Sequence, residues 1–250
     1  MMSENNTEQK QSLSSHLLEL RSRLLRIVLV VLLIFLGLFA FANDLYTLVA
    51  TPLLEALPEG SQMIATDVAS PFLTPFKLAL VAAVFIAVPY ILIEIWGFIA
   101  PGLFRKEKLI VAPIMLLSVC LFYLGVVFAY FAVFPLMFAF FSASGPMGVS
   151  YTPDIARFLD TVLKLFFAFG VAFEIPIVTV VLVYLGVVDV KTLAQKRPYV
   201  IVLCFLIGAL LTPPDPVSQS LMAVPMWLLF ELGLVFARLI RKKTVAAQSD

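Results

Sequence analysis

The sequence predicts an all-α polytopic membrane protein with six transmembrane helices. Hydrophobic residues make up 62% of the 250 residues and charged residues only 13%, whereas a soluble domain carries roughly 25% charged residues. The apolar residues lie in long runs, as membrane-spanning helices require. Lys and Arg fall almost entirely between alternate runs, which gives the two sides of the membrane different charges. A β-barrel would instead require short segments of alternating polarity.

Six apolar runs separated by polar segments are each interpreted as one span. A helix needs about 20 apolar residues to cross a hydrocarbon core of roughly 30 Å. The fifth run has only about fourteen residues, which rise about 21 Å, so the bilayer must thin locally or the helix must lie deep. Pro89 is expected to kink the second helix by removing a backbone hydrogen bond. The six predicted spans are residues 24–42, 76–99, 109–134, 155–186, 198–211 and 217–237.

The remaining segments complete the predicted organisation. Residues 45–57 are apolar but too short to span, so a short interfacial helix is expected there. Residues 187–197 are expected to form a loop before the fifth span. Residues 1–13 form a polar N-terminal segment, residues 14–237 the six-helix membrane domain, and residues 238–250 a cytoplasmic tail that we expect to be disordered.

The cations predict which side of the membrane each connecting segment occupies. Three alternate segments, residues 44–71, 141–154 and 212–216, contain no Lys or Arg. The N-terminal segment, the two other loops and the tail together contain fourteen of the seventeen. Because cytoplasmic segments carry the excess of Lys and Arg, both termini are predicted to be cytoplasmic. The fourteen cations are Lys10, Arg21, Arg23, Arg26, Arg105, Lys106, Lys108, Lys191, Lys196, Arg197, Arg238, Arg241, Lys242 and Lys243.

Several functional classes are disfavoured by the residues that the sequence lacks. His16 is the single histidine, and no nucleophile elbow, HExxH zinc motif or phosphate-binding glycine loop occurs, so an enzyme is not expected. Cys120 and Cys204 lie in apolar runs without metal-binding spacing, which predicts inert thiols, no metal site and no cofactor. With a net charge of +1 and no basic cluster interleaved with aromatic residues, nucleic acid is not an expected partner.

Residues 15–26, SHLLELRSRLLR, are the last polar stretch before the first span. In a helix, this stretch places Glu19, Arg23 and Arg26 on one stripe and leucines on another, so it is amphipathic. One interpretation of Glu19 is an i,i+4 ion pair with Arg23 at the helix surface. The other interpretation is an acceptor for a cationic ligand at the membrane face. The spacing leaves both open.

Glu107 lies in a short basic loop on the same predicted side of the membrane as Glu19. An acid among Arg105, Lys106 and Lys108 is normally just solvated. Taken with Glu19, it provides a second carboxylate that could bind a planar guanidinium bidentately. Such a pair would suit a ligand that carries two arginines.

Glu174 and Glu231 lie inside predicted spans, where an ionised carboxylate is costly and must face protein or water. Glu174, near the middle of the fourth span, is either a hydrogen-bonded packing residue or part of the wall of a hydrated cavity. Pro176 opens the helix beside it and frees backbone carbonyls, which suits a cavity wall. Glu231 in the sixth span, with Arg238 seven residues further on, allows the same two interpretations.

Seven segments, in order along the chain, carry a resemblance to a known family. They resemble the TatC family, the large membrane subunit of the twin-arginine protein translocase, from about residue 16 to residue 238. The segments are HLLELRSRLL (16–25), FANDLY (41–46), MIATDVASPFLTPFKL (63–78), FIAPGLFRKEK (98–108), FAFGVAFEIP (167–176), KRPYV (196–200) and LLTPPDPVSQ (210–219).

The resemblance implies a function in protein export. TatC proteins are receptors that bind the twin-arginine signal peptides of folded proteins and nucleate the export complex in the bacterial inner membrane. Glu19 and Glu107 match the two acids of the family's signal-binding face, and Phe98, Pro101 and Arg21 are placed with them. The proton gradient, acting through the assembly, would drive translocation.

The resemblance also implies partners and a shape. Glu174 matches an intramembrane acid on the concave wall of a cup-shaped helix bundle. Thr212 and Gln219 match a polar patch that contacts the single-span subunits TatA and TatB. The family has short fifth and sixth helices, and several copies of the chain are expected within the complex.

Two other functions stay open as alternatives at this point. A proton-coupled small-solute secondary transporter would use Glu174 as its coupling acid, but no repeat relates the two three-helix halves and no matching pair of broken helices is evident. A purely structural membrane scaffold would make both Glu19 and Glu107 replaceable.

Overall fold

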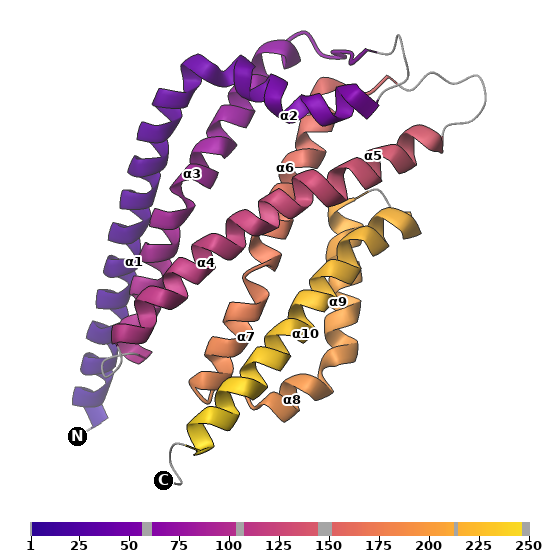
Figure 1. Cartoon of the computed structure of the whole chain (residues 1–250). Helices are drawn as coiled ribbons and strands as arrows, with labels where there is room; N and C mark the ends of the chain where they lie inside the picture. Colours follow the sequence, from indigo (N-terminus) through magenta and orange to yellow (C-terminus); the bar gives the residue numbers. More distant parts are fainter. Residues whose placement is uncertain (1, 57–61, 104–107, 145–151, 213–214, 247–250) are drawn as a thin grey trace. The chain divides into compact units, whose positions relative to one another are not determined.

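The computed structural model of the chain is built from helices, as the sequence predicts (Figure 1). It describes residues 2–56, 62–103, 108–144, 152–212 and 215–246. One isolated bridge joins Ile64 and Asp154. The elements are α1 (Met2–Leu38), η1 (Phe39–Phe41), α2 (Ala42–Ala56), α3 (Ser70–Leu103), α4 (Lys108–Phe128), η2 (Ala129–Val133), α5 (Phe134–Ala143), α6 (Ile155–Ala172), α7 (Ile175–Tyr184), α8 (Val190–Gln195), α9 (Arg197–Leu211) and α10 (Pro216–Ala246).

The apolar helices correspond to the six predicted spans. Within the described residues, five helical stretches are long and apolar enough to cross a membrane, and Arg197–Leu211 is a shorter apolar helix. The expectation of a short sixth helix is wrong, because α10 has 31 residues and its apolar part covers Pro216–Ile240. Helix α10 also continues to Ala246, into the tail expected to be disordered, since Arg, Lys and Ala are good helix formers.

Other boundaries differ from the prediction at prolines. The third span includes η2, a π-helix, and does not end at residue 134 but continues through α5 to Ala143. Pro135 cannot donate to the carbonyl four residues before it, which favours a wider turn there. The fourth span is divided into α6 and α7, and Pro176 lies in the first turn of α7. Pro89, by contrast, lies within α3 without ending it.

Helices also lie outside the six predicted spans. Helix α1 begins at Met2, so the polar N-terminal segment belongs to it. Helix α8 lies within the predicted loop 187–197. Helix α2 follows η1 directly and covers most of the predicted interfacial helix 45–57.

The chain divides into two compact units. The first contains Met1–Leu45 and Pro75–Leu116, and the second contains Tyr46–Thr74 and Leu117–Asp250. In the first unit, the ring of Phe76 on α3 makes edge-to-face contacts with Phe35 and Phe39, at centroid distances of 5.0 and 5.6 Å. Such pairs add to the apolar contact between the two helices.

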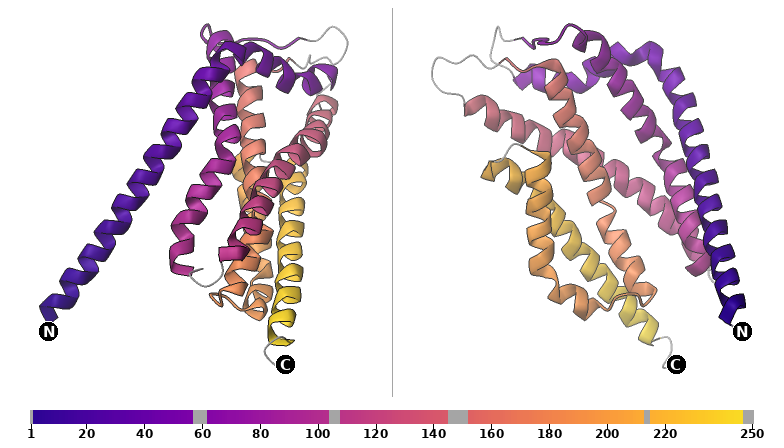
Figure 2. Two further views of the ribbon diagram at one scale, coloured as in Figure 1. Left: turned by 60° about the vertical axis from the view of Figure 1, so that its left-hand side comes forward. Right: turned by 180° about the vertical axis from the view of Figure 1, so that it is seen from behind.

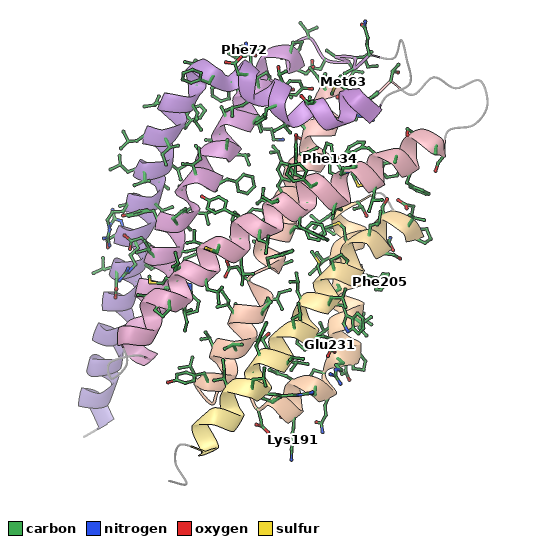
Figure 3. All side chains as sticks on the ribbon, in the orientation of Figure 1. Met63, Phe72, Phe134, Lys191, Phe205 and Glu231 are labelled. Carbon is green, nitrogen blue, oxygen red and sulfur yellow. The ribbon has the colours of Figure 1, made fainter. Side chains whose placement is uncertain are left out.

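An aromatic cluster forms the core of the second unit. Phe134 of α5 is fully buried, and its ring lies 4.6 Å from that of Phe138 and 5.7 Å from that of Phe158 on α6 (Figure 3). Gly125 of α4 lies against the Phe169 backbone, where a side chain would not fit. The absence of a side chain at Gly125 therefore lets α4 and α6 approach closely.

Helix α10 packs along α7 and α9 within the second unit, as both views of Figure 2 show. Phe230, Leu234 and Ala237 recur on one face of α10 and are buried together with Val190 of α8. This spacing of three and four residues is that of an amphipathic helix face. The cluster therefore fixes α8 and the start of α9 against α10.

Asp154 anchors residues 62–74 to the start of α6. One of its carboxylate oxygens accepts hydrogen bonds from the Ala156 and Arg157 amides, and the other from the amide and hydroxyl of Thr66, the hydroxyl at 2.6 Å. These donors, the Thr66 hydroxyl foremost, lower the pKa of Asp154 to about 2. The carboxylate thus caps α6 and fixes a segment 88 residues away in sequence.

Candidate functional site

Glu19 forms the i,i+4 ion pair that its spacing predicts. On α1, Glu19 Oε1 accepts hydrogen bonds from Arg23 Nη2 at 2.7 Å and from Arg23 Nε at 3.1 Å. The Glu19 side chain is 38% exposed, against 19% for Arg23. Glu19 is therefore the outermost of the two and already binds a guanidinium, the group proposed for its ligand.

Glu94 of α3 is a second carboxylate at this position, and sequence reasoning missed it. Its side chain is only 6% exposed. Glu94 Oε2 accepts from Arg23 Nη1 at 2.7 Å, while Oε1 lies 3.1 Å from Arg26 Nη1 and accepts from the Tyr90 hydroxyl at 2.8 Å. Four charged groups thus meet between α1 and α3 in the first unit, two carboxylates and two guanidiniums, with no net charge. We call Glu19, Arg23, Arg26, Tyr90 and Glu94 the guanidinium cluster.

The end of α3 is shaped to receive Arg23. Arg23 Nη2 donates to the carbonyl of Gly97 at 3.1 Å, and Nη1 donates to the carbonyl of Glu94 at 3.3 Å. The Gly97 carbonyl has no helical partner at Pro101, because proline has no N–H. A Cβ atom on Gly97 would lie 2.8 Å from Arg23 Nη1. Gly97 and Pro101 therefore provide space and a free acceptor for the guanidinium.

The other predicted signal-binding residues are placed as follows. Arg21 is exposed on α1, and Phe98 is half-buried near the end of α3. Pro101 lies in the last turn of α3, although its side chain lies outside the part described. Glu107 lies outside the described residues, so its separation from Glu19 stays a prediction.

Glu174 lies where α6 gives way to α7. The buried Ser118 hydroxyl of α4 donates to Glu174 Oε2 in a short hydrogen bond within the second unit. The other carboxylate oxygen, Oε1, is buried and has no hydrogen-bond partner among the residues that the structure describes. The interpretation of Glu174 as a hydrogen-bonded packing residue therefore explains the Oε2 atom but not the Oε1 atom.

Glu231 of α10 forms an ion pair with a different arginine from the one considered in the sequence. Arg197, at the start of α9, donates from Nε and from Nη2 to the two carboxylate oxygens of Glu231, each at 2.6 Å. Figure 3 marks Glu231 on the side of α10 that faces α9. This bidentate pair joins two neighbouring helices, and the partner of Glu231 in it is Arg197 rather than Arg238.

Thr212 and Gln219 lie where α9 ends and α10 begins. The buried Thr212 hydroxyl donates to the Gly208 carbonyl at 2.9 Å and so caps α9. The half-buried Gln219 lies in the first turns of α10, and its backbone passes close to Gly208. The two residues belong to adjacent helix ends, and their contact with partner subunits stays a prediction.

Comparison with known proteins decides the family. A family described as Sec-independent protein translocase protein (TatC) matches residues 15–225. The chain belongs to the TatC family. A TatC protein of Azotobacter chroococcum mcd 1 is 58% identical over 98% of this chain and 96% of its own length. The TatC protein of Escherichia coli K12 is 51% identical over 92% of this chain and 90% of its own.

A solved TatC structure supports the same assignment. The crystal structure of a protein described as twin arginine translocase receptor TatC is 39% identical, with a TM-score of 0.81, and covers 90% of this chain and 98% of that one. The TatC resemblance and the inner-membrane, multi-pass location expected from the sequence are thereby confirmed. TatC membership also decides against the small-solute transporter considered as the alternative, and the chain is a component of a protein translocase.

Proposed function

We propose that this TatC-family chain is the receptor subunit that binds twin-arginine signal peptides and nucleates the export complex. Glu19 and Glu107 would each bind one guanidinium of the signal, and Arg21, Phe98 and Pro101 would border the same face. The observation that carries the proposal is Glu19 itself, a partly exposed carboxylate at the arginine-rich start of the first span that already accepts two N–H donors of a guanidinium.

The chemistry of recognition involves no bond-making. A carboxylate with an exposed edge binds arginine more selectively than lysine, because the planar guanidinium offers two parallel N–H donors. An apolar groove would hold the hydrophobic part of the signal, and the proton gradient would act through the assembled complex. The chain would therefore act by binding and assembly rather than as an enzyme.

The test is signal binding by Glu19 variants. Photocrosslinking of a twin-arginine signal peptide to inner-membrane vesicles that contain the chain should fall at least tenfold in Glu19→Gln, since a charge-assisted pair is lost. Asp189→Asn is the matched control, because Asp189 is an exposed acid on the same predicted side. Undiminished crosslinking in Glu19→Gln would exclude Glu19 from the signal site.

We further propose that Thr212 and Gln219 contact the single-span subunits TatA and TatB, and that several copies of the chain assemble in the complex. Support comes from the position of both residues at neighbouring helix ends, beside the close approach of Gly208 to α10. Disulfide crosslinking from Gln219→Cys to cysteines in each partner tests the contact. No crosslink to either partner would exclude it.

A further inference from the structure

We propose that Arg23 is an internal competitor of the signal peptide for Glu19, and that Glu94 determines how readily Arg23 gives way. Both are thus specificity-determining residues for signal binding. The inference rests on the proposed function, because it assumes that Glu19 receives an arginine of the signal. It assigns a role to Glu94, a buried acid outside the predicted signal-binding set.

The hydrogen bonds of Arg23 show that its guanidinium is fully occupied. Five hydrogen bonds are present, from Nε and Nη2 to Glu19 Oε1, from Nη1 to Glu94 Oε2 and to the Glu94 carbonyl, and from Nη2 to the Gly97 carbonyl. A guanidinium has five N–H donors. An incoming arginine that is to bind Glu19 Oε1 must therefore replace donors that Arg23 already supplies.

The acceptors of Arg23 divide into two sets on different helices. Glu19 of α1 accepts two of the five hydrogen bonds, and acceptors on α3 take the other three. Arg23 can therefore release Glu19 without losing its anion, since Glu94 remains at 2.7 Å. Without the Glu94 carboxylate, Glu19 would be its only anionic partner, and release would be costly.

The exposure of the side chains sets the direction of exchange. Glu19 is 38% exposed, Arg23 19% and Glu94 6%. A ligand from the solvent meets Glu19 first, and Arg23 retreats toward the buried Glu94. A guanidinium can supply both of the N–H donors withdrawn from Glu19 in one plane, whereas the ammonium of a lysine is a point donor. Competition by Arg23 therefore favours arginine over lysine in the signal.

The cluster also predicts which variants keep their fold. In Arg23→Gln, Glu94 retains Arg26 at 3.1 Å and the Tyr90 hydroxyl at 2.8 Å. No buried carboxylate is left without a partner, so this variant is expected to fold. In Glu94→Gln, the amide oxygen can still accept a hydrogen bond from Arg23. The negative charge that competes with Glu19 for Arg23 is gone.

The experiment measures binding of two signal peptides, one with the arginine pair and one with a lysine pair, to the full-length chain in nanodiscs. We expect Glu94→Gln to bind the arginine peptide about tenfold more weakly, because Arg23 then stays on Glu19. We expect Arg23→Gln to bind the arginine peptide more tightly than the wild type does. The variant should also discriminate less between the arginine peptide and the lysine peptide. The double variant should regain at least wild-type affinity.

Opposite results would overturn the proposal. If Arg23 only positions Glu19, then Arg23→Gln weakens binding and the double variant binds no better than Glu94→Gln. Should Glu94→Gln fail to fold, the sign of the Arg23→Gln effect decides alone. Glu231→Gln is the matched control, since it removes a carboxylate from an arginine pair in the other unit and should leave both affinities unchanged.

Failure of this inference is distinguishable from failure of the proposed function. If Glu19→Gln abolishes binding of the arginine peptide but Arg23→Gln weakens it, the signal site stands and the competition is excluded. If Glu19→Gln binds as the wild type does, the signal site itself is excluded and the inference falls with it.

Discussion

Two arginine–glutamate sites in the described part of this TatC-family chain differ in how their charges are shared. In the second unit, Arg197 and Glu231 form a closed pair with two matched hydrogen bonds, and their side chains are 41% and 23% exposed. In the first unit, Arg23 is divided between two carboxylates, and one of them is nearly buried. A closed pair joins helices, whereas a shared guanidinium has two alternative partners. The comparison suggests that only the first site is suited to exchange with a ligand.

Glu94→Ala should produce the largest effect on stability. The variant removes the buried carboxylate and leaves Glu19 as the only anionic partner of Arg23, so the free energy of unfolding should fall by more than in any of the variants that follow. Glu231→Ala should lower the free energy of unfolding by about 1 kcal/mol or less, because its pair is more exposed. Denaturant titration in detergent micelles measures both. Equal losses would mean that the two sites are energetically alike.

Gly97→Ala should disturb the Arg23 site through packing, without removing any charge. The added Cβ would lie 2.8 Å from Arg23 Nη1 and would displace a guanidinium fixed by hydrogen bonds. Because five hydrogen bonds fix the guanidinium, we expect its displacement to outweigh the gain in helix propensity of up to about 1 kcal/mol and so to lower the free energy of unfolding. Gly37→Ala, where nothing lies within 4 Å of the new atom, should instead stabilise α1 by up to about 1 kcal/mol. Thermal unfolding of the two variants should therefore shift in opposite directions.

Asp154→Ala measures the contribution to stability of a carboxylate whose described donors are backbone amides and a hydroxyl instead of a guanidinium. Loss of the α6 cap should cost about 1 kcal/mol at neutral pH. Because folding lowers the pKa of Asp154 to about 2, its contribution is present above the unfolded pKa of about 3.9 and is lost as the pH falls through 2. The difference in unfolding temperature between wild type and variant should therefore shrink toward pH 2. A constant difference from pH 7 to pH 2 would contradict the assignment.

Arg197→Lys should produce the smallest effect. Lysine keeps the charge but cannot form the two parallel hydrogen bonds to Glu231. For a pair this exposed, we expect only a small lowering of the unfolding temperature, one that decreases as salt is added. The salt dependence of the unfolding temperature is the measurement. A loss above that of Glu94→Ala would reverse the order of the two sites.

The sequence predicts the spans well because their signal is local. Apolar length and the positions of cations are properties of continuous stretches, and the six predicted spans correspond to helices of the structure. The errors lie at the ends, where α10 continues to Ala246 and α5 extends the third span. At the end of α10 the polarity of the residues changes but their helix propensity does not. At α5 the residues stay apolar, and the π-helix beside Pro135 lets the span continue.

The guanidinium cluster was only half predictable. The Glu19–Arg23 pair follows from a spacing of four residues, but the Arg23–Glu94 contact joins positions 71 apart. A signal did exist, since Glu94 is an acid inside an apolar run and two arginines on the first span required partners. Glu231 teaches the same lesson, because its partner lies 34 residues back rather than seven ahead. Tertiary packing decides such pairs.

The π-helix at Ala129–Val133 has a consequence for the rest of its span. A π turn accommodates one residue more than an α turn, and each residue advances an α-helix by about 100°. The face of α5 is thus out of phase with that of α4 by one residue. Deleting one residue from this turn would restore a regular helix and rotate Phe134 and Phe138 away from α6. The third span therefore holds its aromatic face toward the core by an insertion, not by its hydrophobic repeat.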